Sequence, residues 1–91
     1  MVEPSDHVQT SLKIIRAYLM NAFPGFDMWD EAEPGICHKF VLTNPQTAEE
    51  LKLKVGWARL SDGLDEPVMM ERVLVYSDVA GKLREAKYYY W

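Results

Sequence analysis

The chain has 91 residues, of which 48% are hydrophobic and 12% aromatic, and its formal net charge at pH 7 is −4. This length predicts one domain over residues 1–91, and the hydrophobic fraction excludes an intrinsically disordered chain. The acidic balance argues against duplex DNA or an anionic membrane as a partner, because both select basic surfaces.

One cysteine, Cys37, is present, so the chain has no pair for an intramolecular disulfide. Single-cysteine usage is typical of a reducing compartment. The first residues lack the basic and apolar regions of a signal peptide, and no run approaches the roughly 18 apolar residues of a membrane span. We therefore expect a cytoplasmic protein without a membrane partner.

Residues 5–22 are predicted to form a helix that Ser5 or Asp6 can cap. Its apolar side chains repeat with a 3.6-residue period along one face, at Val8, Leu12, Ile15 and Leu19. Pro24 follows closely and ends the helix, because a residue before proline is pushed out of the α region.

The apolar period then changes to two, which predicts strands over residues 26–31 and 36–43. Pro34 and Gly35 occupy the central positions of a type II turn that joins them into a hairpin. Residues 51–60 give the clearest alternation in the chain. Leu51, Leu53, Val55 and Trp57 are predicted to face inward, with Lys52 and Lys54 outward.

The last third of the chain is less regular. Residues 68–76 are apolar at most positions, which predicts a central strand. Residues 83–90 are predicted to form a final strand, because the run of aromatic residues favours β structure and Gly81 would interrupt a helix. A short helix capped by Ser77 or Asp78 is the alternative.

These elements predict an α+β fold with an N-terminal helix packed on a four- to five-stranded antiparallel meander sheet, because short connections favour neighbouring strands. The chain contains no internal repeat and no low-complexity tract.

The most unusual segment is the C-terminal run of Tyr88, Tyr89, Tyr90 and Trp91. In a strand, only one alternate pair needs to face the core, so the other pair would form an exposed aromatic surface. Tyrosine and tryptophan are enriched in interface cores, and unprotected edge strands tend to pair. We therefore expect a non-enzymatic protein-binding or regulatory module that associates through this strand. We expect a homo-oligomer such as a homodimer first, and association with another protein otherwise.

A pocket between helix and sheet is the main alternative. It would bind a small molecule or make the chain a minor enzyme. Its apolar walls and few polar groups would come from His38, Phe40, Trp57, Met70 and Tyr76. In a chain this short, the same side chains are also needed for the core.

A single-stranded nucleic acid is a third and less favoured partner, given the acidic balance of the chain. Bases stack on aromatic rings while cations follow the phosphates. Basic residues precede the aromatic run at Lys82, Arg84 and Lys87.

No residue pattern predicts a cofactor or a metal. Cys37 and His38 are adjacent in a strand, so they point to opposite faces and cannot form a nucleophile–base pair. The first hairpin is rich in carboxylates that could bind a hard cation, but their spacing matches no calcium loop and indicates a solvated hairpin. These residues are Asp27, Asp30, Glu31 and Glu33.

Overall fold

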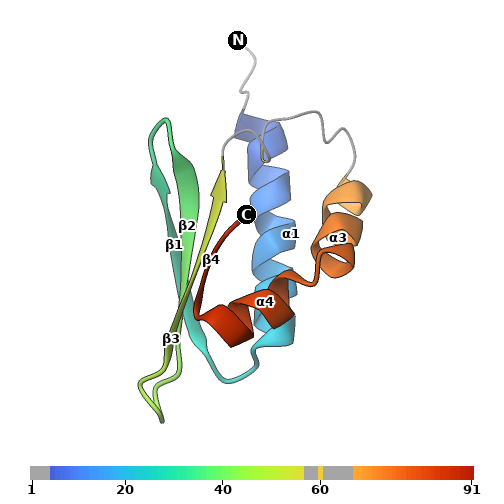
Figure 1. The fold of residues 1–91 in the computed structure, drawn as a ribbon. Coiled ribbons are helices and arrows are strands. Elements are labelled where there is room, and N and C mark those ends of the chain that lie inside the picture. Colours follow the sequence, from blue (N-terminus) through green and yellow to red (C-terminus); the bar gives the residue numbers. More distant parts are fainter. Residues whose placement is uncertain (1–4, 57–59, 61–66) are drawn as a thin grey trace.

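The computed structural model describes residues 5–56, 60 and 67–91. The elements in chain order are α1 (Ser5–Ala22), β1 (Asp27–Glu33), β2 (Cys37–Thr43), β3 (Glu50–Gly56), α3 (Pro67–Tyr76), α4 (Val79–Ala86) and β4 (Tyr88–Tyr90). The labelled helices all lie on one side of a single sheet (Figure 1). This combination of helices and a sheet confirms the predicted α+β class.

Helix α1 has the bounds that the sequence predicts. Its buried face is formed by Leu12, Ile15 and Leu19. Gly25, with φ of 89°, takes the left-handed conformation that reverses the chain after the helix. The hydrophobic period therefore places α1 correctly and also identifies its core face.

Strands β1 and β2 form the predicted hairpin. At its turn, Ile36 donates its N–H to the carbonyl oxygen of Glu33 at 3.0 Å, and Gly35 has φ of 77°. Pro34 and Gly35 therefore take the positions that a type II turn requires. β3 pairs antiparallel with β2 and ends at Gly56, while residues 57–59 of the longer predicted strand lie outside the described residues.

The segment 68–76 is helix α3 and not a strand, so this part of the prediction is wrong. Met70 and Leu74, four residues apart, are buried, while Val75 and Tyr76 are exposed. A spacing of four residues places both side chains on one face of a helix. α3 packs against α1. Because nearly every residue here is apolar, periodicity alone could not separate a buried strand from a helix.

The strand predicted over residues 83–90 is also wrong for most of its length, since residues 79–86 form α4. The carboxylate of Asp78 caps this helix by accepting the Gly81 N–H at 3.3 Å. A Cβ at Gly81 would lie 2.3 Å from a carboxylate oxygen of Asp78. The glycine that argued against a helix is thus the residue that leaves room for its cap.

After α4, the chain forms the short strand β4, which pairs with β3 in parallel. The sheet has the order β1-β2-β3-β4 and is mixed, so the predicted antiparallel meander is wrong at its last strand. α3 and α4 stand between β3 and β4 in the chain and return it to the end of the sheet where β3 began, as a parallel connection requires.

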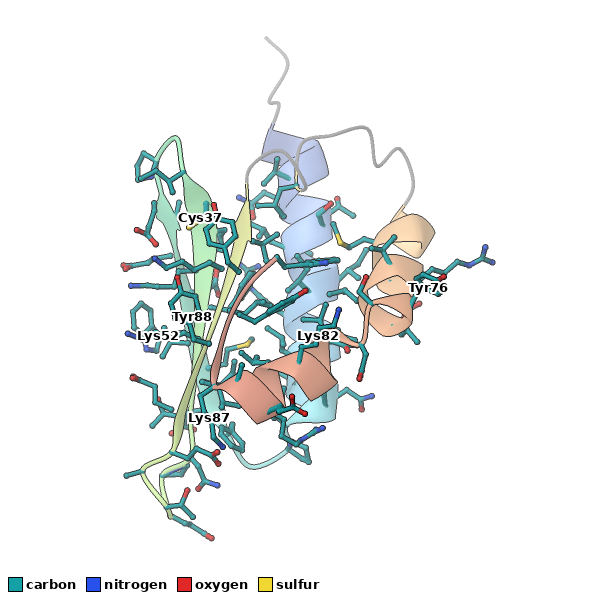
Figure 2. The ribbon with its side chains drawn as sticks, viewed as in Figure 1. Cys37, Lys52, Tyr76, Lys82, Lys87 and Tyr88 are labelled. Carbon is teal, nitrogen blue, oxygen red and sulfur yellow. The ribbon has the colours of Figure 1, made fainter. Side chains whose placement is uncertain are left out.

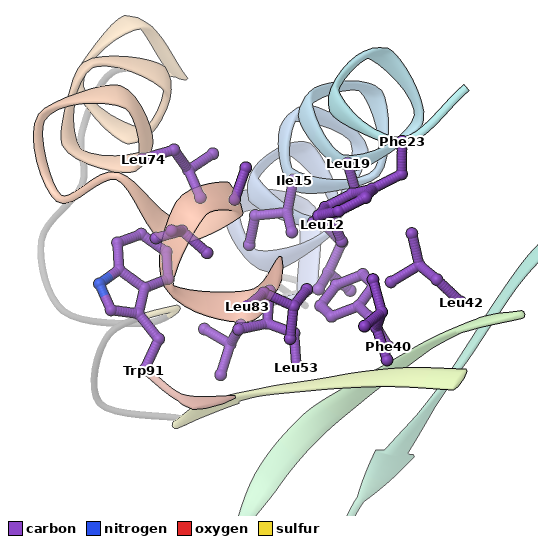
Figure 3. Close-up of a cluster of buried hydrophobic side chains, with 14 of the residues drawn as sticks. Leu12, Ile15, Leu19, Phe23, Phe40, Leu42, Leu53, Leu74, Leu83 and Trp91 are labelled. Carbon is purple, nitrogen blue, oxygen red and sulfur yellow. The ribbon is translucent and has the colours of Figure 1, made fainter. Parts of the chain in front are cut away.

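The core lies between the helices and the sheet (Figure 3). Side chains from all the layers meet in it, including Leu12, Leu19, Phe40, Leu53, Leu74, Leu83 and Trp91. The sheet contributes the residues of alternate positions, so its other face takes no part in this core.

Candidate functional site

The sheet face that points away from the helices is the first candidate site. We call it the outer face, and it carries Trp29, Glu31, Glu33, Cys37, Lys39, Val41, Lys52, Lys54, Tyr88 and Tyr90. No helix of the described chain covers it (Figure 1). Figure 2 shows Lys52 and Tyr88 projecting on this side.

Aromatic residues stand at both edges of the outer face. One register row crosses all four strands, from Trp29 through Val41 and Lys52 to Tyr88. The relative exposure is 50% for Trp29, 50% for Tyr88 and 52% for Tyr90. Exposed aromatic residues gathered on one surface indicate an interaction site more strongly than the same residues scattered singly.

Lysines lie between these aromatic edges. The ammonium of Lys39 lies 5.4 Å from the ring centroid of Trp29, and that of Lys54 lies 5.9 Å from the ring centroid of Tyr88. Both distances are within the range of cation–π attraction. Lys52 is exposed and forms no salt bridge with any residue that the structure describes. The centre of the outer face is therefore basic.

Acidic residues border the face on β1. Glu31 pairs with Lys39 at 3.1 Å, and Glu33 pairs with Lys54 at 3.3 Å. The Cys37 thiol, and then Lys54, hold the pKa of the Glu33 carboxyl below its ordinary value, and Glu33 raises the pKa of Lys54. Because these pairs are partly exposed to solvent, each contributes little stability and leaves its lysine available to another anion.

A partly buried polar cluster on the inner face is the second candidate. Arg16 of α1 donates from Nε and Nη2 to the carboxylate of Asp30 on β1, at 2.9 and 2.8 Å. The Nε2 atom of His38 lies 2.6 Å from the same carboxylate. Arg16, and then His38, hold the pKa of Asp30 below its ordinary value, and Asp30 raises the pKa of Arg16.

His38 is the most buried member of this cluster, with a relative exposure of 6%. Its ring lies 5.1 Å from that of Phe40. The Nδ1 atom has no hydrogen-bond partner in the described part of the chain. No nucleophilic side chain of the described residues therefore bonds to Nδ1. The cluster joins α1 to the sheet, because Arg16 and His38 share the carboxylate of Asp30.

The predicted C-terminal interface divides into two pairs. Tyr88 and Tyr90 lie on the outer face, whereas Tyr89 is half-buried against the core and Trp91 is buried in it. The alternation expected of a strand thus selects Tyr88 and Tyr90 as the accessible pair.

The predicted pocket residues are not gathered around one site. His38 and Phe40 lie on the inner face, and Met70 is buried on α3. Tyr76 has a relative exposure of 93% and points away from the sheet (Figure 2), so its assignment to a pocket wall is wrong. Trp57 lies outside the described residues.

The basic residues expected to follow phosphates are spread around α4. The ammonium of Lys82 lies 5.6 Å from the Tyr89 ring, and the guanidinium of Arg84 lies 5.0 Å from the Phe23 ring. Lys87 pairs with Glu49. The lysines that stand opposite the exposed tyrosines in the sheet are instead Lys52 and Lys54, which the alternation of β3 places outward.

Cys37 lies on the outer face but is fully buried, and its thiol donates to a carboxylate oxygen of Glu33 at 3.4 Å. Burial, and then Glu33, raise the pKa of this thiol above its ordinary value. A nucleophilic cysteine needs the opposite shift. Cys37 is therefore a packing residue.

The described residues form neither a metal centre nor a membrane-spanning helix. Within the described ranges, no three His, Cys, Asp or Glu side chains converge in a way that could bind a metal ion. No helix among the same residues has the length and apolar character needed to cross a membrane.

Comparison with models of known protein families, with curated proteins and with solved structures finds no match for this chain. Its function must therefore be inferred from the geometry of its own surfaces.

Proposed function

We propose that this chain is a non-enzymatic protein-binding module that binds through its outer face and the adjoining edge of β4. The position of Tyr88 and Tyr90 supports this most directly. Both are half exposed on an edge strand, next to Lys52 and Lys54. Tyrosine supplies a large apolar area and a hydroxyl at little cost in side-chain entropy, which makes it a frequent interface residue.

Tyr88 and Tyr90 are not members of the hydrophobic core. The core on the inner face already contains Tyr89 and Trp91 from the same segment. Trp29, on the opposite edge of the sheet, is as exposed as Tyr88. Aromatic residues at both edges of an uncovered sheet are better explained by a partner that covers them than by the stability of the domain alone.

The cytoplasm is the compartment that we propose for this module. Cys37 is a free thiol, and single free cysteines are typical of reducing compartments.

A small-molecule-binding domain is the alternative function, and one observation favours it. The Nδ1 atom of His38 is buried without a hydrogen-bond partner among the described residues, so a hydrogen-bonding group of a ligand would satisfy it. A metabolite screen by thermal shift, repeated with His38→Phe, tests this. A ligand that raises the melting temperature of the wild type alone would favour the pocket over the outer face.

Selection of peptides from a random display library tests the proposed function. We expect enrichment on the wild-type protein and loss of binding on Tyr88→Ser/Tyr90→Ser. Val75→Ser/Tyr76→Ser is the matched control, because these exposed residues lie on α3 away from the sheet. A library that yields no binder, or binders that tolerate the β4 variant, would contradict the proposal.

A further inference from the structure

The two edges of the sheet carry opposite charge, and this difference limits what can bind there. β1 carries Asp27, Glu31 and Glu33 on its outer side. The β4 side carries Lys52 and Lys54 on β3, with Lys82 over Tyr89 on the inner side. Glu50 lies on the same face at the start of β3, opposite Thr43. The β1 edge is therefore acidic, and the part of the face beside Tyr88 and Tyr90 is basic.

The backbone of β4 can accept another strand. Lys52 donates its N–H to the carbonyl oxygen of Lys87, and Trp91 donates its N–H to the carbonyl oxygen of Lys54. Alternate residues of a parallel strand bond to opposite sides. The N–H and C=O groups of Tyr88 and Tyr90 therefore point to the outer edge, where no strand of the described sheet pairs with them.

From these observations we propose that β4 receives an extended acidic segment of another protein, which adds to its edge as a strand and places carboxylates beside Lys52 and Lys54. The inference rests on the proposed function and names the partner of the same site. Strand addition supplies main-chain hydrogen bonds, and alternate side chains supply specificity. The exposed rings of Tyr88 and Tyr90 would pack against the apolar residues of such a segment.

Symmetric pairing through β1 is disfavoured by charge, because two β1 edges would bring carboxylates together and like charges across strands are destabilising. Symmetric pairing through β4 would place Tyr88 and Tyr90 of two copies side by side and would bring no carboxylate to Lys52, which an acidic segment supplies. Pairing β1 of one copy with β4 of the next is complementary in charge, but it is a head-to-tail contact that gives a ring or an open chain of copies and not a symmetric dimer.

Nucleic acid fits the same lysines less well. The β1 border of the outer face is acidic, because Glu31 and Glu33 stand beside Lys39 and Lys54. A phosphate chain crossing the sheet would meet Glu31 and Glu33, whereas a short acidic peptide along the β4 edge would avoid them.

Fluorescence anisotropy with labelled synthetic probes tests this assignment. The probes are a capped peptide in which glutamate alternates with valine, the same peptide with lysine for glutamate, and oligouridine. We expect the glutamate peptide to bind at least about 10-fold more tightly than the lysine peptide. Lys52→Glu should weaken binding of the glutamate peptide by at least about 10-fold. The control, Lys13→Glu on the exposed side of α1, should weaken this binding by less than about 2-fold.

A second pair of variants tests strand addition. Tyr90→Pro removes both the ring and the N–H at the outer edge, while Tyr90→Ala removes the ring and keeps the N–H. Proline is tolerated in an edge strand where the lost N–H faces outward. We expect Tyr90→Pro to weaken binding of the glutamate peptide by at least about 5-fold more than Tyr90→Ala does, which corresponds to one main-chain hydrogen bond. Circular dichroism checks that both variants fold.

Several results would overturn the inference. These are equal binding of the two peptides, tighter binding of oligouridine, or growth of open assemblies of the protein alone. Display binders that need Tyr88 and Tyr90 but carry no acidic residues would overturn the inference and leave the proposed function intact. A library without binders would overturn both.

Discussion

Arg16 and Asp30 form a two-point ion pair that joins the middle of α1 to β1, with both guanidinium contacts shorter than 3.0 Å. His38 shares the same carboxylate from the neighbouring strand. On the inner face, Asp30 and His38 are diagonal neighbours, because Asp30 lies opposite Phe40 and Ala32 lies opposite His38. One carboxylate thus fixes the position of a helix relative to two strands.

Replacing Arg16 by methionine should keep the aliphatic packing and leave Asp30 with only His38. We expect the free energy of unfolding to fall by about 1–3 kcal/mol, less than for a fully buried pair, because the Arg16 side chain is 34% exposed. Urea denaturation measures the change. Arg72→Met on the exposed side of α3 is the control and should stay within about 0.5 kcal/mol of the wild type.

The same ion pair gives stability a pH dependence. The pKa of Asp30 is lower in the folded state than the ordinary value of about 3.9. Ionised Asp30 therefore contributes stability above about pH 4, and the contribution is lost as pH falls through the folded pKa.

Urea denaturation between about pH 5 and pH 2 measures this dependence. We expect the wild type to lose stability more steeply than Asp30→Asn, which has no proton to gain. Asp27→Asn, on the exposed side of the same strand, should keep the wild-type slope. Parallel curves for the wild type and Asp30→Asn would show that the pair does not act in this way.

Much of the fold follows from local patterns in the sequence. α1 has one apolar stripe, and Pro34 and Gly35 specify the hairpin turn, so both are predictable. α3 is not, because an apolar run fits a buried strand and a buried helix equally well. The parallel place of β4 depends on the path that α3 and α4 take across the sheet.

The candidate site is only partly predictable. Lys52 and Lys54 follow from the alternation of β3, and Tyr88 and Tyr90 follow from that of β4 once its phase is known. Trp29 belongs to the same surface only through the register that places it opposite Val41. The cluster of Arg16, Asp30 and His38 likewise needs the docking of α1, which no local pattern contains.

The contact between Asp78 and Gly81 makes a sharp test of the cap of α4. Gly81→Ala would bring a Cβ 2.3 Å from a carboxylate oxygen of Asp78 and force the cap to move. We expect a loss of about 0.5–2 kcal/mol, the value of an N-cap. Urea denaturation of the variant measures it.

The same substitution should behave differently once the cap is gone. Asp78 has φ of 52°, which glycine adopts without strain, so Asp78→Gly removes the carboxylate and keeps the backbone conformation. In that background, Gly81→Ala should be neutral or stabilising by up to about 1 kcal/mol, because alanine favours helix. An equal loss in both backgrounds would mean that the carboxylate is not the obstacle.

The C-terminal aromatic residues should differ sharply in their contribution to stability. Trp91 is buried in the core, so Trp91→Ala should lower the free energy of unfolding by about 3–5 kcal/mol. Tyr90 is half exposed, and its ring lies over Gly56, 3.6 Å from the position that a Cβ on that glycine would take. Tyr90→Ala should therefore cost less than about 1 kcal/mol.

This difference decides how variants of the segment can be used. Binding lost with Tyr90→Ala reports on the outer face, because the fold is preserved, whereas binding lost with Trp91→Ala reports on unfolding. Thermal and urea denaturation of both variants separate the two effects. If Tyr90→Ala costs as much stability as Trp91→Ala, the exposed tyrosines are structural, and the case for β4 as a binding edge fails.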